Sequence, residues 1–189
     1  MELDQRFKTG GESELSELIT KYGEKLLRYA TSILYSHQDA EDVVQDAFLS
    51  AYQSRASFDG KNISAWLYKI TYHYSLNKLK ERKRRKAVFL EDIKKDTAVY
   101  EQSFNHMPDI MDALKPLKPQ ERALLFGRVV NGQSYDELSQ ILGPSPAALR
   151  KQYERVKKKA AKYLEDYEYV ADSYYMPHTA LRHKGGTCS

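Results

Sequence analysis

Three groups of polar side chains in this chain of 189 residues have types and spacings suited to binding charged partners. An acidic face carries Asp42, Gln45 and Asp46, and neither acid has a Lys or Arg four residues further along. The charges are therefore uncompensated within their own helix, which favours a basic protein partner, although a solvated helix face shows the same pattern. A basic block at 78–86 holds seven Lys or Arg residues and one Glu, and a third group lies at 134–159.

The segment 134–159 has the layout of a DNA-binding helix-turn-helix. Ser134 and Glu137 have capping-box spacing, Gly143 would end the first helix, and Ser145 would cap the second. The second helix of such a motif enters the major groove, where Arg and Gln bind base edges and Lys meets phosphates. The expected DNA-contacting residues are Ser145, Ala147, Ala148, Arg150, Lys151, Gln152, Arg155 and Lys158. Leu149 and Tyr153 would face the domain interior, and an ordinary helical hairpin with a solvated basic end is the alternative.

The basic block at 78–86 follows a run of aromatic residues on the same expected helix. Single-stranded nucleic acid is bound by aromatic stacking faces beside a positive groove, and this combination favours such a role. A solvated helix end or a nuclear-localisation-like patch are the alternatives. Since one helix face cannot bury every aromatic ring, we expect Tyr74 in the core, Tyr72 and His73 at the surface, and Trp66 in either place.

Apolar residues recur at helical spacing and strand signals are almost absent, so we predict an all-α fold that positions these groups. The helices expected from spacing and caps cover residues 14–34, 37–53, 64–86, 119–130, 135–142 and 146–164. We expect two small helical domains, 1–86 and 109–167, joined by a flexible linker at 87–108 where periodicity fades. The second would be the helix-turn-helix domain, and the tail at 168–189 is expected to be disordered.

Composition indicates a globular protein with separate surfaces for separate partners. The formal net charge is +4, and residues 1–53 contain ten Asp or Glu against five Lys or Arg. No apolar run approaches the roughly 20 residues that span a bilayer, and the first residues lack the features of a signal peptide. The lone cysteine, Cys188, can form no internal disulfide, and we expect a cytoplasmic protein without membrane insertion.

Catalytic interpretations find little support in the sequence. There is no phosphate-binding Gly-rich loop and no Gly-x-Ser-x-Gly elbow. A nuclease would need a third carboxylate beside Asp42 and Asp46, and the spacing places none there. His178, His183 and Cys188 have no known zinc spacing. We therefore expect no catalytic residue, no metal site and no cofactor.

Taken together, these motifs resemble an extracytoplasmic-function sigma factor, the minimal two-domain class of the bacterial sigma-70 family. The resemblance covers about residues 12–167, with three motifs in the family's order and spacing. It rests on Asp39-Ala-Glu-Asp-Val-Val-Gln-Asp-Ala-Phe-Leu49, on Trp66-Leu-Tyr-Lys-Ile70 with the basic run after it, and on Ala113-Leu-x-x-Leu117, Arg122 and Ser134-Tyr-Asp-Glu-Leu-Ser-Gln-Ile-Leu-Gly143. A stand-alone helix-turn-helix repressor or activator, with a dimerising first domain, is the rival.

The resemblance implies a role for each group of residues. Asp42, Gln45 and Asp46 would contact the clamp helices of the largest subunit of core RNA polymerase. The loop around Phe58, Asp59 and Gly60 would hold a flipped base of the non-template strand. The melted −10 element would also be bound by His73, Asn77, Lys78, Lys80, Arg82, Arg84 and Arg85. The helix that begins near Ser145 would bind the double-stranded −35 element, and the family implies an anti-sigma factor as regulator.

Overall fold

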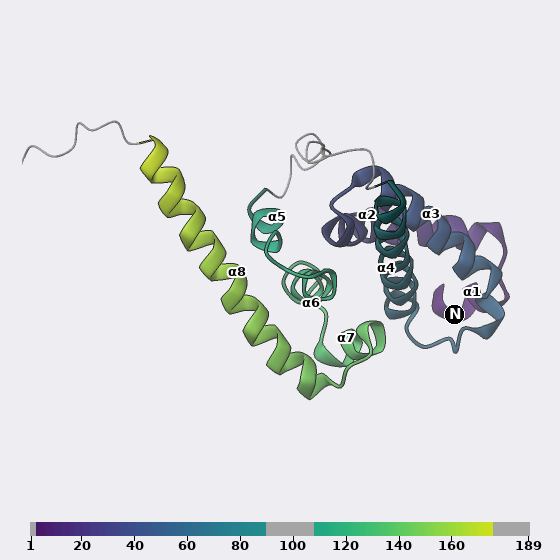
Figure 1. Ribbon diagram of the computed structural model, residues 1–189. Coiled ribbons are helices and arrows are strands. Elements are labelled where there is room, and N and C mark those ends of the chain that lie inside the picture. Colours follow the sequence, from purple (N-terminus) through teal and green to yellow (C-terminus); the bar gives the residue numbers. More distant parts are fainter. Residues whose placement is uncertain (1–2, 90–107, 176–189) are drawn as a thin grey trace, which may run out of the picture.

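The computed structural model describes residues 3–89 and 108–175, and every regular element within these ranges is a helix. In chain order they are α1 (Leu3–Thr9), α2 (Glu12–Leu34), α3 (His37–Gln53), the short 3-10 helix η1 (Arg55–Ser57), α4 (Ile63–Phe89), α5 (Pro108–Leu114), α6 (Pro119–Val129), α7 (Tyr135–Leu142) and α8 (Pro146–Tyr175) (Figure 1). The all-α prediction is therefore confirmed. Residues 90–107, most of the expected linker, lie outside the described residues.

The first region is built from α1 to α4, with α2, α3 and α4 packed against one another. The Ser36 hydroxyl accepts a hydrogen bond from the Asp39 amide at 3.3 Å, and so caps the start of α3. The sequence interpretation missed α1, which is a short helix that buries only Leu3 and Phe7. Seven residues with two buried apolar side chains are too few for a periodic pattern to identify a helix.

The second region is built from α5 to α8, and local hydrogen bonds set its boundaries. Glu137 Oε2 accepts from the Ser134 amide at 2.8 Å while Ser134 Oγ accepts from the Glu137 amide at 3.2 Å, which completes the capping box at α7. Gly143, with φ of +101°, ends α7, and Ser145 Oγ accepts from the Ala148 amide at the start of α8. The helix α8 continues to Tyr175, beyond its expected end and eight residues into the tail expected to be disordered.

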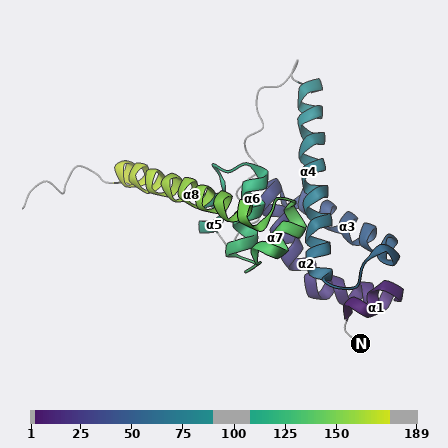
Figure 2. The ribbon, with the colours of Figure 1, turned by 90° about the horizontal axis from the view of Figure 1, so that it is seen from below.

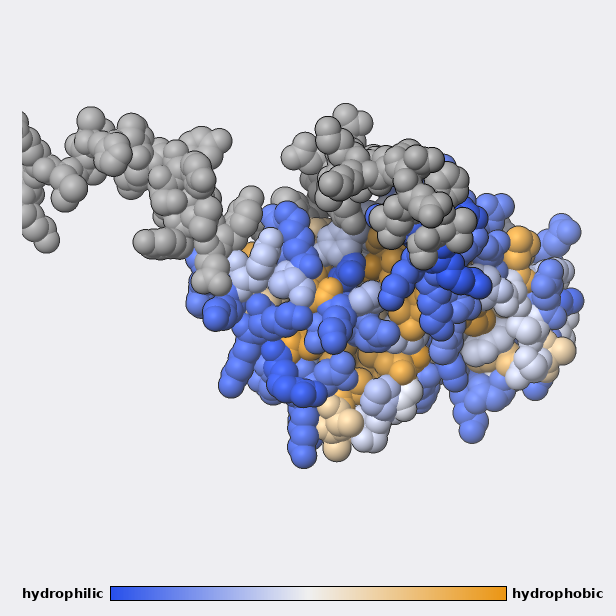
Figure 3. Space-filling model, in the orientation of Figure 1, coloured by the Kyte–Doolittle hydropathy of each residue, from blue (hydrophilic) through white to orange (hydrophobic). Residues whose placement is uncertain are grey.

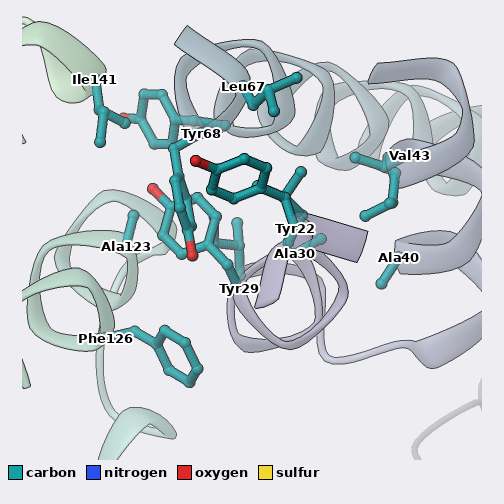
Figure 4. Close-up of a cluster of buried hydrophobic side chains, with 14 of the residues drawn as sticks. Tyr22, Tyr29, Ala30, Ala40, Val43, Leu67, Tyr68, Ala123, Phe126 and Ile141 are labelled. Atoms are coloured by element: carbon teal, nitrogen blue, oxygen red, sulfur yellow. The ribbon is translucent and has the colours of Figure 1, made fainter. Parts of the chain in front are cut away.

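Side chains from both regions meet in one hydrophobic core. The rings of Tyr29 on α2 and Phe126 on α6 lie 6.3 Å apart, and Figure 4 shows Tyr29 next to Tyr68 of α4, with Phe126 and Ile141 of α7 coming from the second region. The two regions are therefore packed together here, although about twenty residues of chain separate α4 from α5.

Polar contacts cross the same boundary. Arg122 Nη1 on α6 donates to the Ile33 carbonyl at 2.8 Å, and the Arg122 guanidinium lies 4.5 Å from the centre of the Tyr35 ring. The Tyr35 hydroxyl donates to the Met111 carbonyl on α5 at 3.0 Å. Arg122 and Tyr35 thus connect the end of α2 to the second region by directional interactions as well as by packing.

Helix α4 is packed against other helices on more than the single face that the sequence predicted. It packs against α2 and α3 on one side and against α7 on another. Tyr72, expected at the surface, is only 5% exposed, whereas His73 is exposed as expected and Tyr74 is half-buried. The error arose because a single buried face was expected, whereas α2, α3 and α7 all pack against α4. Burial raises the pKa of Tyr68 to about 12 and also raises the pKa of Tyr72.

Candidate protein and nucleic-acid interfaces

The acidic face of α3 borders an apolar groove. Gln45 and Asp46 are exposed, and Gln45 lies at the edge of a groove of about 480 Å³ between α2 and α3. The apolar lining comes from Leu15, Ile19, Leu27, Val44, Phe48 and Leu49. Ile19 and Leu49 remain 46% and 50% exposed. Helical periodicity groups Ile19 with the buried apolar residues of α2, so the sequence did not indicate this groove. An apolar groove beside polar side chains is the surface that an amphipathic helix of another protein needs.

The acids of α3 have basic partners on another helix. Lys78 Nζ on α4 lies 3.1 Å from Asp42 Oδ2 and 3.5 Å from Asp39 Oδ1, and Arg82 pairs with Asp39. The hydrogen bond to Asp42 is the main cause that raises the pKa of the Lys78 ammonium. Within α3 neither Asp42 nor Asp46 has a Lys or Arg four residues further along, as the sequence indicated, and these cations come from another helix.

Several candidate residues for single-stranded DNA are engaged in the protein itself. Lys78 and Arg82 pair with the acids of α3, and Arg82 Nη1 also donates to the Leu34 carbonyl at 3.1 Å. The remaining candidates on α4 are exposed: His73, Asn77, Lys80, Arg84 and Arg85. The half of α4 that carries the basic block projects beyond the packed helices (Figure 2), so this part of the helix is open to a polyanion.

The loop between α3 and α4 presents its three candidate residues differently. The Phe58 ring is 2% exposed and stacks on Trp66, with ring centres 5.0 Å apart and an interplanar angle of 29°. Gly60 is buried and has a φ of +80°, a conformation that favours glycine. Asp59 is exposed, and its Oδ1 accepts from the Lys61 amide at 3.0 Å. Of the three, only Asp59 therefore offers a side chain at the surface.

The first turns of α8 present the expected recognition residues together. Ala147, Ala148, Arg150, Lys151, Arg155 and Lys158 are exposed, as is the cap Ser145, and Gln152 is half-buried. Leu149 is 1% exposed and Tyr153 packs edge-on to Tyr135 with ring centres 6.2 Å apart, so both face inward as predicted. The Arg150 guanidinium lies 5.3 Å from the centre of the Tyr135 ring. In Figure 3 the side of the molecule formed by α8 is mainly hydrophilic.

Two further features of the described residues concern metal binding and membrane spanning. Residues 3–89 and 108–175 hold no group of three or more His, Cys, Asp or Glu side chains placed to bind a metal ion. Within the same ranges no helix combines the length and apolar character that crossing a bilayer requires. His178, His183 and Cys188 lie outside the described residues.

Comparisons with known proteins identify both regions. The family described as Sigma-70 region 2 matches residues 18–85, which include α3 and most of α2 and α4. The family described as Sigma-70, region 4 matches residues 108–159, from α5 into α8. The two matches contain every candidate polymerase-binding and DNA-binding residue described above.

Proteins with similar sequences are named as RNA polymerase sigma factors. The chain is 26% identical over 156 residues to the ECF RNA polymerase sigma factor SigE of Mycolicibacterium smegmatis, covering 78% of this chain. It is 30% identical over 125 residues to the RNA polymerase sigma-H factor of Pseudomonas aeruginosa, covering 66% of this chain. In each case the match spans 60% of the relative's length.

A solved structure has a similar fold. The sigma factor RpoE of Bartonella quintana, in complex with the anti-sigma factor NepR, superposes with a TM-score of 0.68 at 22% identity. The match covers 79% of this chain and 96% of that one. With both sigma-70 regions matched in order along one helical chain, and with relatives that are themselves sigma factors, the chain belongs to the sigma-70 family, in its extracytoplasmic-function class.

Proposed function

We propose that this protein is a transcription initiation factor that brings core RNA polymerase to a subset of promoters and helps to melt their −10 element. The observation that carries the proposal is that each sigma-70 region has exposed side chains whose chemistry suits the partner proposed for it, polymerase and single-stranded DNA for the first region and duplex DNA for the second. The first region has a polar face beside an apolar groove on α3 and a projecting basic helix, and the second has a capped recognition helix. The protein would act in the cytoplasm, catalyse no reaction of its own and need no cofactor.

Polymerase would bind the first region through Gln45, Asp46 and the adjoining groove. Asp42 is less available than these two side chains because Lys78 pairs with it. Polymerase binding at Asp42 would therefore compete with this ion pair, and release of Lys78 would add a cation to the DNA-binding side of α4. Docking and DNA binding would be coupled in this way through one exposed ion pair of modest strength.

Promoter DNA would be bound at two places. The exposed residues of α8 from Arg150 to Lys158 would bind the −35 duplex, and the basic end of α4 with Asp59 would bind the melted −10 strand. The two elements are separate stretches of one DNA molecule. The contacts through Arg122 and Phe126 would therefore have to break before both elements are bound. The packed arrangement described here would be a closed form of the factor.

An anti-sigma protein would stabilise this closed form. Support comes from the Bartonella relative, whose structure was solved as a complex with an anti-sigma factor. The apolar groove between α2 and α3 would be blocked or occupied in such a complex, which would keep polymerase away.

Reconstitution with core RNA polymerase tests the proposal. The purified chain and core enzyme should form a complex by size-exclusion chromatography, and transcripts made from genomic DNA should start at a discrete set of sites. Failure to bind core enzyme, or starts no more selective than those of core enzyme alone, would falsify it. A repressor or activator would instead bind duplex DNA by itself and leave core enzyme unbound.

A further inference from the structure

The short helix α1 lies directly against the loop that precedes α4. It packs on η1, and three hydrogen bonds join the segment 4–10 to the segment 55–63. The family match to region 2 begins only at residue 18, so α1 lies outside it. A helix outside the matched region therefore holds the loop that the proposed function assigns to base binding.

The three hydrogen bonds hold the loop at its beginning, middle and end. Arg55 Nε donates to the Gly10 carbonyl at 3.0 Å. Gln5 Nε2 donates to the Gly60 carbonyl at 3.2 Å. Asp4 Oδ2 accepts from the Ile63 amide at 3.1 Å, which satisfies the first backbone N–H of α4. Two of the three bonds, to the Gly60 carbonyl and from the Ile63 amide, involve the backbone of the loop, so these contacts constrain the path of that backbone.

Aromatic packing closes the inner side of the same loop. Phe7 on α1 is fully buried and meets the edge of Trp66, with ring centres 6.4 Å apart. Trp66 in turn stacks on Phe58. The Phe58 ring is thus part of the core between α1 and α4, and it is unavailable for stacking on a nucleic-acid base while α1 is in place.

With Phe58 buried, the outer side of the loop presents only a few side chains to solvent. Between Phe58 and Asn62 the exposed side chains are those of Asp59 and Lys61. A carboxylate is an acceptor only, and it suits the exocyclic amino group of a base, whereas a lysine ammonium suits a phosphate. The Gly60 carbonyl next to Asp59 is the atom to which Gln5 donates, so the position of the carboxylate depends on that hydrogen bond.

We propose that α1 is a specificity-determining part of the −10 site, in which Gln5 and Asp4 position the loop so that Asp59, rather than Phe58, binds the flipped base. Asp59 contacts the base, and Gln5 and Asp4 are positioning residues. The inference rests on the proposed function, since it concerns the base-binding loop of that same site. It adds that α1, through Gln5 and Asp4, helps to determine which base Asp59 binds in the −10 element.

Base discrimination by the reconstituted holoenzyme tests the inference. Abortive RNA synthesis is measured on a panel of promoters in which each non-template base of the −10 element is replaced in turn. Gln5→Glu keeps the shape of the side chain but replaces its donor with an acceptor that repels the Gly60 carbonyl. Asp59→Asn replaces one carboxylate oxygen with a donor. Lys8→Ala, an exposed substitution elsewhere on α1, is the matched control.

Gln5→Glu and Asp59→Asn should lower discrimination at one and the same base position, by about fivefold for the loss of one hydrogen bond. The double variant should lose little more than Asp59→Asn alone, because Gln5 acts through Asp59. Lys8→Ala should leave the profile unchanged, and affinity for −35 duplex should be unchanged in every variant.

Two results overturn the inference while leaving the proposed function intact. One is a Gln5→Glu protein that has a lower melting temperature but the same discrimination between −10 bases as the wild type, since α1 would then only stabilise the fold. The other is an Asp59→Asn protein with an unchanged base profile. If wild-type protein gives no initiation with core enzyme at any promoter, the proposed function is wrong, and this inference is overturned with it.

Discussion

Arg122→Ala should shift the protein from the closed form towards an open one. Arg122 joins the two regions through its 2.8 Å hydrogen bond to the Ile33 carbonyl and through its position 4.5 Å from the Tyr35 ring. A hydrogen bond from a charged donor contributes about 1.5–3 kcal/mol. The cation–π contact adds about 0.5–1 kcal/mol at a partly exposed site. Since Arg122 is only half-buried, we take the lower end, about 2 kcal/mol. The ratio of closed to open protein should then fall about thirtyfold.

Single-molecule energy transfer measures this ratio directly. Cys188→Ser removes the only native thiol, and cysteines at the exposed positions Gln53 on α3 and Lys157 on α8 then carry the dyes. Arg122→Ala should populate a low-transfer state that is rare in the parent. Its melting curve, followed by circular dichroism, should keep the helical signal at low temperature, since the helices themselves remain.

Arg128→Ala is the matched control. Arg128 Nη1 donates to the Gln133 carbonyl at 2.8 Å and its guanidinium lies 5.0 Å from the centre of the Tyr135 ring, so both contacts lie within the second region. This variant should keep the parent's transfer distribution. An unchanged distribution in Arg122→Ala, or an equal shift in Arg128→Ala, would refute the role assigned to Arg122.

Three further predictions concern polymerase binding, promoter reading and pH. Replacing Gln45 and Asp46 together by Ala should weaken core-polymerase binding without changing the melting temperature, as measured by titration of labelled protein; unchanged affinity would remove this face from the interface. If Arg150 makes a bidentate base contact, Arg150→Ala should lower the binding free energy by about 1–3 kcal/mol for duplexes with the preferred base pair at one −35 position. Competition binding with substituted duplexes measures this preference. An equal loss of affinity for every duplex would show that Arg150 contacts phosphate instead. The buried neutral Tyr68, with its pKa raised from 10 to about 12, contributes stability that is complete below pH 10 and lost as the pH rises to about 12, because the unfolded tyrosine ionises first. This pKa change corresponds to roughly 3 kcal/mol, so Tyr68→Phe should flatten this part of the curve of unfolding free energy against pH in urea unfolding, and an unchanged slope would contradict it.

Helix boundaries that depend on local hydrogen bonds could be predicted from the sequence. The capping box of Ser134 and Glu137 and the cap at Ser36 join groups only three residues apart. The turn at Gly143 depends on one residue's own backbone freedom. The inward side of α8, marked by Leu149, follows from helical periodicity in the same way. These features are complete within a few residues of chain, so composition and spacing were enough to identify them.

The candidate site was less predictable wherever its residues depend on a distant partner. Helical periodicity identified an acidic face on α3, but the cation that pairs with Asp42 comes from Lys78, 36 residues away. The loop around Phe58 was expected to hold a base, but the sequence did not show that the Phe58 ring stacks on Trp66, whose edge meets Phe7. Tyr72 was expected at the surface because a single buried face was assumed for α4, a helix against which α2, α3 and α7 all pack. Nothing in the local sequence distinguishes an exposed ring from one that a remote helix covers.

The packing of the two regions against each other was likewise visible only in the tertiary structure. Tyr29 and Phe126 lie almost one hundred positions apart, and their packing depends on a core formed jointly by α2, α4, α6 and α7. From the sequence, each region could be recognised as a helical unit with its own binding chemistry. Whether those units lie apart or together, and which charges remain available to a partner, depends on burial and on contacts between distant segments. The hydrophobic effect that drives such burial acts on any apolar surface and carries no local signal of the partner it will select.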